Sequence, residues 1–241
     1  MERNRLLLVA GAIVAAVVVV VVIVVVAGSS SKSTSTTTTT APPVTTTGSG
    51  GSGTEAQSTF AGVPQHGDTL GKPTAGATLA VYEDPQCPYC QQWNIDTLPT
   101  VVQNYVRTGR LKVVYHGVVI IGTNSVNGLR AIYAAGLQNK LWNMNEALYE
   151  RQGDENSGWI TIGLIKQAAR EVGANAAKLI ADADSATVTK ELRRSEAAAE
   201  AINLNGTPTF TIQKTLGQEQ QLSVAGLEPN DFTSALDAAL Q

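Results

Sequence analysis

The two cysteines of this 241-residue chain lie three positions apart in the motif Cys87-Pro88-Tyr89-Cys90. This spacing is typical of redox chemistry. An apolar run at residues 77–83 precedes the motif and predicts a strand, followed by a helix that begins at Cys87. At the start of a helix, unpaired backbone N–H groups and the helix dipole favour a thiolate, the reactive form of cysteine. We therefore expect Cys87 to be the nucleophile and Cys90, one turn further on, to be the resolving thiol.

A CxxC motif can also be a structural disulfide or half of a zinc site. Zinc needs two further ligands, and the two histidines of the chain, His66 and His116, stand at distances from the motif that match no finger or ribbon. A disulfide across two residues closes a very short loop, so it removes little entropy from the unfolded chain. Both alternatives stay open, but the spacing favours redox chemistry.

The first 27 residues bear on the cellular compartment. Arg3 and Arg5 precede an uncharged apolar run, residues 6–27, that is long enough to span a bilayer. Arginines on the N-terminal side predict that this end stays in the cytoplasm and that the rest of the chain is exported. The alternative is a signal peptide cleaved after the small-residue sequence Val25-Val26-Ala27. The length of the apolar run favours a retained membrane anchor, and both readings place the domain outside the cytoplasm.

Residues 28–59 consist mainly of Ser, Thr, Gly and Pro. Such a composition cannot bury enough apolar surface to form a core, so we predict a flexible linker. The remaining residues, 60–241, have the length of one domain. The formal net charge of the chain is −3, and the domain carries no basic run, which argues against nucleic-acid binding.

The pattern along residues 60–241 predicts an α/β domain with a helical middle. A strand at residues 78–83 is followed by a helix to about residue 107, bent at Pro99, where a backbone donor is missing. The apolar run at residues 111–115 predicts a second strand, parallel to the first. Helical periodicity then continues from residue 124 to about 195, with breaks at residues 153–158 and at Gly173. A further helix is expected at residues 185–203.

The segment Asn205-Gly206-Thr207-Pro208 places a proline at the beginning of a β-prone run. Proline cannot donate to a strand ladder, so it belongs at the first residue or the edge of a strand. Residues 210–213 and 221–224 predict an antiparallel hairpin joined around Gly217. Residues 229–240 predict a final amphipathic helix.

This order of elements resembles the thioredoxin fold, in its DsbA-like branch, with a mixed sheet flanked by helices and an all-helical insertion at about residues 123–195. The segments Gly62-Val63-Pro64-Gln65, Leu70-Gly71 and Asp84-Pro85-Gln86-Cys87-Pro88-Tyr89-Cys90-Gln91 are similar to those of membrane-anchored and secreted bacterial members. The resemblance implies a cis peptide bond at Thr207-Pro208, a loop there that faces the cysteines, and binding of the substrate backbone by this loop. It also implies that Pro88 and Tyr89 tune the redox potential.

The chain departs from the thioredoxin pattern at one informative position. Thioredoxin has a buried acid six residues before the first cysteine, where this chain has Val81. Glu83 and Asp84 are the nearest acids, and a carboxylate just before a helix is more often a solvated partner of the helix dipole, so we assign neither a catalytic role. A lone histidine at a strand end, His116, is expected to be a surface or capping residue. We expect Trp93, Trp142 and Trp159 to fill the core or the helical interface.

The sequence does not fix the direction of the reaction, because the same dithiol can donate, remove or reshuffle disulfides according to its potential. The resemblance to monomeric oxidases favours a disulfide-donating oxidase acting on reduced or misoxidised exported polypeptides. A reductase or isomerase, including one that serves cytochrome c maturation, and a tethered peptide-binding module are the alternatives. The resemblance further implies a recycling partner in the membrane, DsbB-like or similar to vitamin K epoxide reductase. No metal, nucleotide or flavin motif is found, so no cofactor is expected.

Overall fold

The computed structural model describes residues 59–241. The predicted membrane anchor and almost all of the predicted linker lie outside the described residues. None of the helices between residues 59 and 241 combines the length and apolar character that a membrane span requires.

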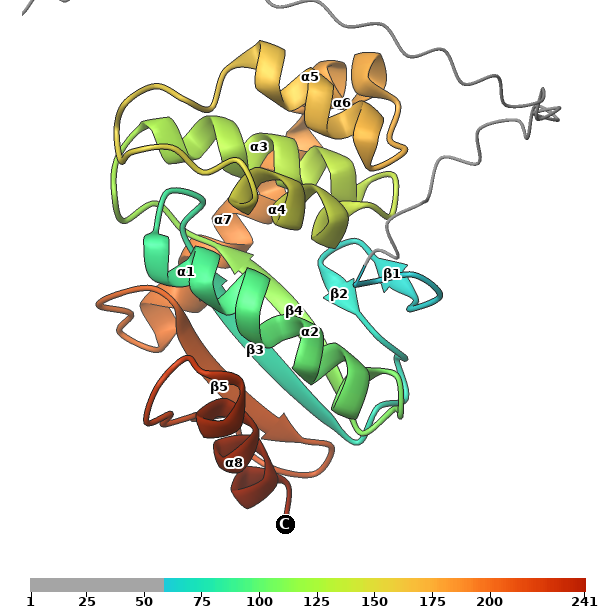
Figure 1. Ribbon diagram of the computed structural model, residues 1–241, viewed down its shortest axis with the longest axis vertical. Helices are drawn as coiled ribbons and strands as arrows, with labels where there is room; N and C mark the ends of the chain where they lie inside the picture. The colour runs from blue at the N-terminus through green and yellow to red at the C-terminus, as the bar shows by residue number, and fades with distance from the viewer. Residues whose placement is uncertain (1–58) are drawn as a thin grey trace, which may run out of the picture. The chain divides into compact units, whose positions relative to one another are not determined.

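A mixed sheet of six strands forms the centre of the described domain (Figure 1). The long strands β3 (Ala77–Glu83) and β4 (Leu111–Gly117) run parallel, and β5 (Thr209–Lys214) is antiparallel to β3 on its other side. Three strands of two residues extend the edges in the order β1-β2-β4-β3-β5-β6: β1 (Gln65–His66), β2 (Thr69–Leu70) and β6 (Gln220–Gln221). The predicted α/β class and the parallel pairing of the first two long strands are confirmed.

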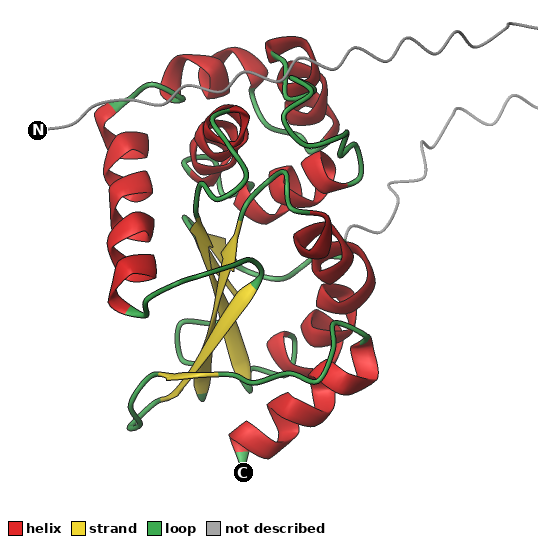
Figure 2. Ribbon diagram, turned by 90° about the vertical axis from the view of Figure 1, so that its left-hand side faces the viewer, coloured by secondary structure: helices red, strands yellow, loops and turns green. Residues whose placement is uncertain are grey.

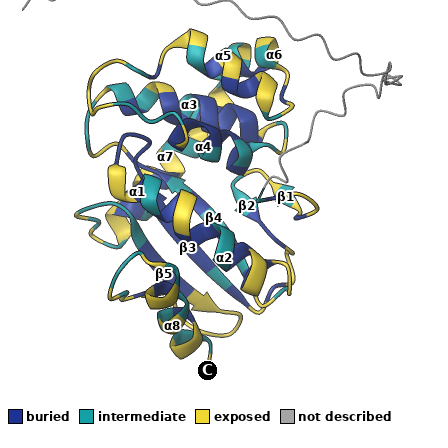
Figure 3. Cartoon of the chain, viewed as in Figure 1, coloured by how far each residue is buried: buried dark blue, intermediate teal, exposed yellow. Residues whose placement is uncertain are grey.

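Helices cover both faces of the sheet (Figure 2). Every residue of β3 except Thr78 is buried, as expected for a central strand whose two faces are both covered, whereas burial in β4 alternates along the strand. Figure 3 shows this contrast between the buried centre of the domain and the exposed outer surfaces of the helices. The strand that leads to the cysteines is therefore the most enclosed part of the sheet.

The helical run that carries the cysteines has two π-helical segments in it. It consists of α1 (Pro88–Gln92), η1 (Trp93–Thr97), α2 (Leu98–Val101) and η2 (Val102–Val106). The first π segment ends two residues before Pro99, which cannot donate a hydrogen bond, and Leu98 N donates to Trp93 O, five residues back. The predicted helix is thus confirmed in extent, and the proline marks its irregular part.

Five helices follow β4 and include the predicted helical middle. They are α3 (Asn124–Gly136), α4 (Leu141–Tyr149), α5 (Ile162–Glu171), α6 (Ala176–Asp182) and α7 (Ala186–Ala201). Thr161, Asn175 and Ser185 cap α5, α6 and α7, each accepting a hydrogen bond from the backbone N–H three residues on. The cap at Ser185 explains why the last of these helices begins where the sequence predicts.

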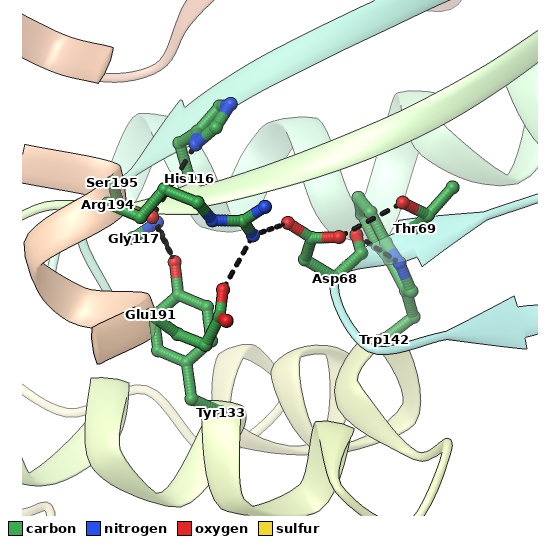
Figure 4. A network of polar contacts seen from close by, with 9 residues as sticks. All are labelled: Asp68, Thr69, His116, Gly117, Tyr133, Trp142, Glu191, Arg194 and Ser195. Carbon is green, nitrogen blue, oxygen red and sulfur yellow. Dashed lines mark hydrogen bonds and ion pairs between the residues drawn. The ribbon is translucent and has the colours of Figure 1, made fainter. Parts of the chain in front are cut away.

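A polar network fixes α7 against the sheet and α3 (Figure 4). Arg194 forms ion pairs with Asp68, in the turn between β1 and β2, and with Glu191. The hydroxyl groups of Tyr133 and Ser195 lie 2.5 Å apart, and the amide of Gly117 donates to the Tyr133 hydroxyl oxygen. These contacts tie three elements that are distant in sequence into one unit.

His116 belongs to the same network and is half-buried. Its ring stacks on Tyr82 with centroids 4.7 Å apart, and its Nδ1 lies 3.5 Å from the hydroxyl of Ser195. Burial lowers the pKa of His116. The expectation of a surface or capping histidine is therefore only partly right, because α7, which starts 70 residues later, packs against β4.

The last helix, α8 (Pro229–Leu240), has the predicted bounds. The ring centroid of its Phe232 lies 4.3 Å from that of Trp93 and 4.7 Å from that of Phe210. Trp93 and Trp142 are fully buried and Trp159 packs against the core, so the expected core role of the tryptophans is confirmed. The hairpin partner of β5 is shorter than predicted, since only Gln220–Gln221 pairs with it.

Candidate active site

Cys87 is the N-cap residue of α1, with an extended backbone at φ −74° and ψ 121°. Pro88 occupies the first turn, where a missing N–H costs nothing. Both cysteines are free thiols. Cys87 retains 4% of its surface and Cys90 retains none, so the two sulfurs differ in their access to a partner.

The surroundings of Cys87 stabilise its thiolate. The Cys90 thiol donates a hydrogen bond to it, as do the Thr207 side chain and the backbone amides of Cys90 and Tyr89. Partial burial opposes these donors, but together they lower the pKa of Cys87 from 9.0 to about 6. The thiolate therefore predominates at neutral pH, mainly because of the second cysteine and less because of the short helix itself.

Cys90 has the opposite properties. Burial, the hydrogen bond to Cys87 and the charge of Glu83 all raise its pKa well above 9.0. A sulfur that is buried and protonated cannot be reached by an outside disulfide, but it stands in contact with Cys87. This asymmetry is what a nucleophile and a resolving thiol require.

The loop before β5 faces the cysteines. Its peptide bond Thr207-Pro208 is cis, as the resemblance implied. The Cys87 thiol lies 3.2 Å from the carbonyl oxygen of Thr207, within hydrogen-bonding distance. The structure thus brings together the CxxC motif and the Thr-Pro loop, which the sequence separates widely.

Glu83 is fully buried behind the cysteines, contrary to the expectation of a solvated acid. Its Oε1 accepts from Asn94 Nδ2 at 2.8 Å, and its Oε2 accepts from Asn145 Nδ2 at 3.0 Å and from the Tyr149 hydroxyl at 3.3 Å. Burial raises the pKa of Glu83 to about 7, even though the three donors favour the carboxylate. Asn94 Nδ2 also donates to Cys90 O at 2.9 Å, which links this group directly to the resolving cysteine.

Asp84 is also fully buried and acts as an acceptor for several donors. Its Oδ1 accepts from Gln86 N at 2.8 Å and from the Ser125 hydroxyl at 2.6 Å. Its Oδ2 accepts from the amides of Ile120 and Ile121 at 2.7 and 2.9 Å. The carboxylate therefore fastens the loop after β4, and the start of α3, to the segment that leads into the CxxC motif. The prediction of a solvated dipole partner is wrong for this acid too.

The chain between α4 and α5 also holds the motif. Gln152 Nε2 donates to Pro85 O at 3.0 Å and to Cys87 O at 3.1 Å. Gln91 Nε2 donates to Tyr149 O at 2.7 Å, at the end of α4. These contacts position the nucleophile from outside the strand-and-helix unit that carries it.

Sequence reasoning missed Asn94, Asn145, Tyr149 and Gln152. The sequence does carry a signal for Asn145 and Tyr149. Asn145 and Tyr149 stand four residues apart in a predicted helix, so they share a face with the apolar residues Leu141 and Leu148. A polar amide on an otherwise apolar face indicates a buried hydrogen-bonding partner, although the sequence does not identify that partner.

No group of three or more His, Cys, Asp or Glu residues in the described part of the chain is placed to hold a metal ion. The sulfurs are instead surrounded by apolar and hydrogen-bonding groups.

Two large side chains near the cysteines are exposed. Tyr89 is 64% exposed beside Cys87, and Ile120 is 47% exposed in the loop that Asp84 holds.

A family model described as thioredoxin matches residues 65–228. The chain belongs to the thioredoxin family. One curated relative is disulfide bond formation protein D of Bacillus subtilis. It is 24% identical over 166 residues, which cover 68% of this chain and 73% of the relative. A probable disulfide bond formation protein D of Bacillus anthracis is 23% identical over 155 residues, 61% of this chain and 70% of the relative.

Solved structures agree with the family assignment. The crystal structure of oxidised BdbD from Bacillus subtilis matches with a TM-score of 0.63 and 20% identity, covering 74% of this chain and 97% of BdbD. A thioredoxin-like oxidoreductase from Silicibacter pomeroyi matches with a TM-score of 0.55 and 27% identity, covering 76% and 96%. Wolbachia pipientis alpha-DsbA1 matches with a TM-score of 0.58 and 16% identity, covering 72% and 90%. The thioredoxin fold is confirmed, and the chain is a DsbA-like protein thiol:disulfide oxidoreductase.

Proposed function

We propose that this protein is an extracytoplasmic disulfide-donating oxidase that uses a Cys87–Cys90 redox pair. The observation that carries the proposal is the difference between the two sulfurs. Cys87 has a pKa of about 6, retains 4% of its surface and lies beside Thr207, whereas Cys90 is completely buried and protonated. Two relatives are named as disulfide bond formation proteins, which supports disulfide donation as the direction of the reaction.

The reaction begins when a thiolate of a reduced substrate attacks Cys87 in the oxidised protein. The Cys87–Cys90 bond breaks, a mixed disulfide forms between Cys87 and the substrate, and Cys90 leaves as a thiolate that takes up a proton. A second substrate thiolate attacks its partner sulfur in the mixed disulfide, which forms the substrate disulfide and releases the Cys87 thiolate. A low pKa makes Cys87 a good leaving group and stabilises the reduced protein, and both favour donation of the disulfide.

Glu83 is the group best placed to exchange the proton with Cys90. It is buried in the same region, shares the donor Asn94 with Cys90, and has a pKa of about 7. Transfer from a carboxyl group of that pKa to the Cys90 thiolate is favourable, because the pKa of Cys90 lies well above 9.0. Glu83 then regains a proton from solvent in the next cycle.

Thr207 and Pro208 bind the substrate backbone, while Pro88 and Tyr89 tune the potential. The chain acts as a monomer at the cell membrane, held by residues 1–27 with Arg3 and Arg5 on the cytoplasmic side and joined to the domain by residues 28–59. A membrane thiol oxidase, DsbB-like or similar to vitamin K epoxide reductase, re-forms the disulfide after each turnover.

The equilibrium with glutathione tests the direction of the reaction. An oxidase is expected to have a potential near or above about −180 mV, and a value near about −270 mV would instead indicate a reductase. Thiol exchange with a cysteine-containing peptide tests the redox role itself. Cys87→Ser should abolish it, and full exchange by that variant would leave the peptide-binding module as the better explanation.

A further inference from the structure

Two side chains from the helical middle reach into the rear of the redox site. Asn145 and Tyr149 both come from α4, one turn apart, and both are fully buried. Asn145 Nδ2 lies 3.0 Å from Glu83 Oε2 and 2.9 Å from Asn94 Oδ1. The Tyr149 hydroxyl lies 3.3 Å from Glu83 Oε2 and 3.1 Å from Asp84 O.

The ring of Tyr149 also packs in one cluster with Cys87 and Cys90, so this side chain contacts the cysteines and Glu83 together. The ring contact could be made equally well by phenylalanine. The hydroxyl adds only the hydrogen bonds to Glu83 and to the backbone of Asp84. A residue with only a packing role would need the ring but not the hydroxyl.

The ionisable groups that interact with Glu83 are Cys87 at the N-cap of α1, Cys90 in α1, Tyr149 in α4 and Tyr115 in β4. None of them is a cation, so no positive charge among them stabilises the carboxylate. The carboxylate is stabilised instead by the neutral donors Asn94, Asn145 and Tyr149, two of which come from α4. Negative charge on Cys87 acts in the opposite direction and favours the protonated acid.

We propose that Asn145 and Tyr149 are positioning residues of the redox reaction, which hold the Glu83 carboxylate behind Cys90 and set the pH range over which it exchanges a proton with the cysteine pair. The inference rests on the proposed function, in which the leaving Cys90 thiolate takes a proton from the Glu83 carboxyl group. The donors stabilise Glu83 after it has given up that proton. Removing one of them should make Glu83 hold its proton to a higher pH.

The decisive variant is Tyr149→Phe, with Tyr133→Phe as its matched control. Tyr133 is also a buried tyrosine, but its hydroxyl forms hydrogen bonds with Ser195 and Gly117. The first measurement is the carbon NMR titration of the Glu83 side-chain carboxyl in the reduced protein, assigned by its loss in Glu83→Gln. The second is the pH dependence of the redox potential against glutathione over the same range.

In Tyr149→Phe, the Glu83 midpoint is expected to move upward by about half a unit to one unit, because the carboxylate loses one donor and the lost hydrogen bond, at 3.3 Å, is long. The break in the pH dependence of the potential should move with it, and Tyr133→Phe should move neither. Asn145→Leu, which keeps the shape of the side chain, should act in the same direction and provides the test if Tyr149→Phe does not fold.

Three results would overturn the proposal: an unchanged Glu83 midpoint, an equal shift in the Tyr133→Phe control, or a shifted midpoint that leaves the pH dependence of the potential unchanged. The titration requires no catalysis, so its outcome is separate from a failure of the proposed function. That failure would show as a wild-type protein that does not exchange disulfides with a peptide at any pH.

Discussion

The Sγ of Cys87 lies 3.2 Å from the carbonyl oxygen of Thr207, although 120 residues separate them in the chain. The contact joins the start of the active-site helix to the loop that enters β5. A polypeptide bonded to Cys87 would therefore lie close to the backbone of Thr207. The nucleophile and the proposed binding loop thus form one surface, and the whole helical middle of the chain is inserted between them in sequence.

Cys87 should react with iodoacetamide far faster than Cys90 at pH 7. The pKa of Cys87 is about 6, so its thiolate predominates above pH 6 and is lost as the pH falls below that value. Mass spectrometry of peptides after brief alkylation over pH 4–9 measures both rates. Equal rates for the two cysteines would contradict the asymmetry described for the site.

Loss of the thiol at Cys90 should raise the pKa of Cys87, because that thiol is the strongest of the donors that stabilise the thiolate. We expect the alkylation midpoint of Cys87 to rise by about one pH unit in Cys90→Ala. Cys90→Ser keeps a donor at the same place and is the control, with a smaller rise. If both variants titrate like the wild type, the helix and the Thr207 loop alone determine the pKa.

The stability of the reduced protein should depend on pH through Glu83. Its pKa is raised from 4.5 in the unfolded chain to about 7 in the folded protein. The unfolded chain therefore loses this proton first as the pH rises, and the contribution to stability, complete below pH 4.5, is lost between pH 4.5 and 7. At about 1.4 kcal/mol per unit, the loss is about 3 kcal/mol.

Urea denaturation of the wild type and of Glu83→Gln at several pH values checks this prediction. The glutamine variant lacks the titration, so its free energy of unfolding should fall less over this range. A difference between the two proteins that stays constant from pH 4 to pH 8 would show that Glu83 titrates at its ordinary value.

Asp84→Asn should destabilise the protein strongly. The carboxylate accepts four hydrogen bonds in a buried place, and an amide in its position would direct a donor at other donors. We expect a loss of about 2–4 kcal/mol in the free energy of unfolding. Asp237→Asn is a suitable control, because Asp237 is exposed and its ion pair is with the exposed Arg110, so the loss of its charge should cost less than about 1 kcal/mol.

The elements near the cysteines could be predicted because their signals are local. A β-prone run before CxxC, a Thr-Pro sequence before a hairpin and Pro229 at the start of a helix each identify a boundary. The two-residue strands β1 and β2 were not predicted, since so short a run has no periodicity. Their existence depends on pairing with β4, and the sequence of residues 65–70 does not show that pairing.

The burial of Glu83 and Asp84 could not be predicted either. An acid just before a helix is usually solvated, and nothing within ten residues indicates otherwise. Their partners Asn145, Tyr149 and Ser125 lie about 40 to 65 residues further along the chain. Only the folded arrangement, in which α3 and α4 pack over the end of β3, removes the carboxylates from water.

Pro88 and Tyr89 are exposed, whereas the cysteines on either side of them are buried. The two side chains between the sulfurs therefore contribute little to the interior of the protein. Substitutions at exposed positions usually change stability by no more than about 0.5 kcal/mol. The dipeptide that we propose to tune the redox potential can therefore be substituted with little effect on the stability of the domain.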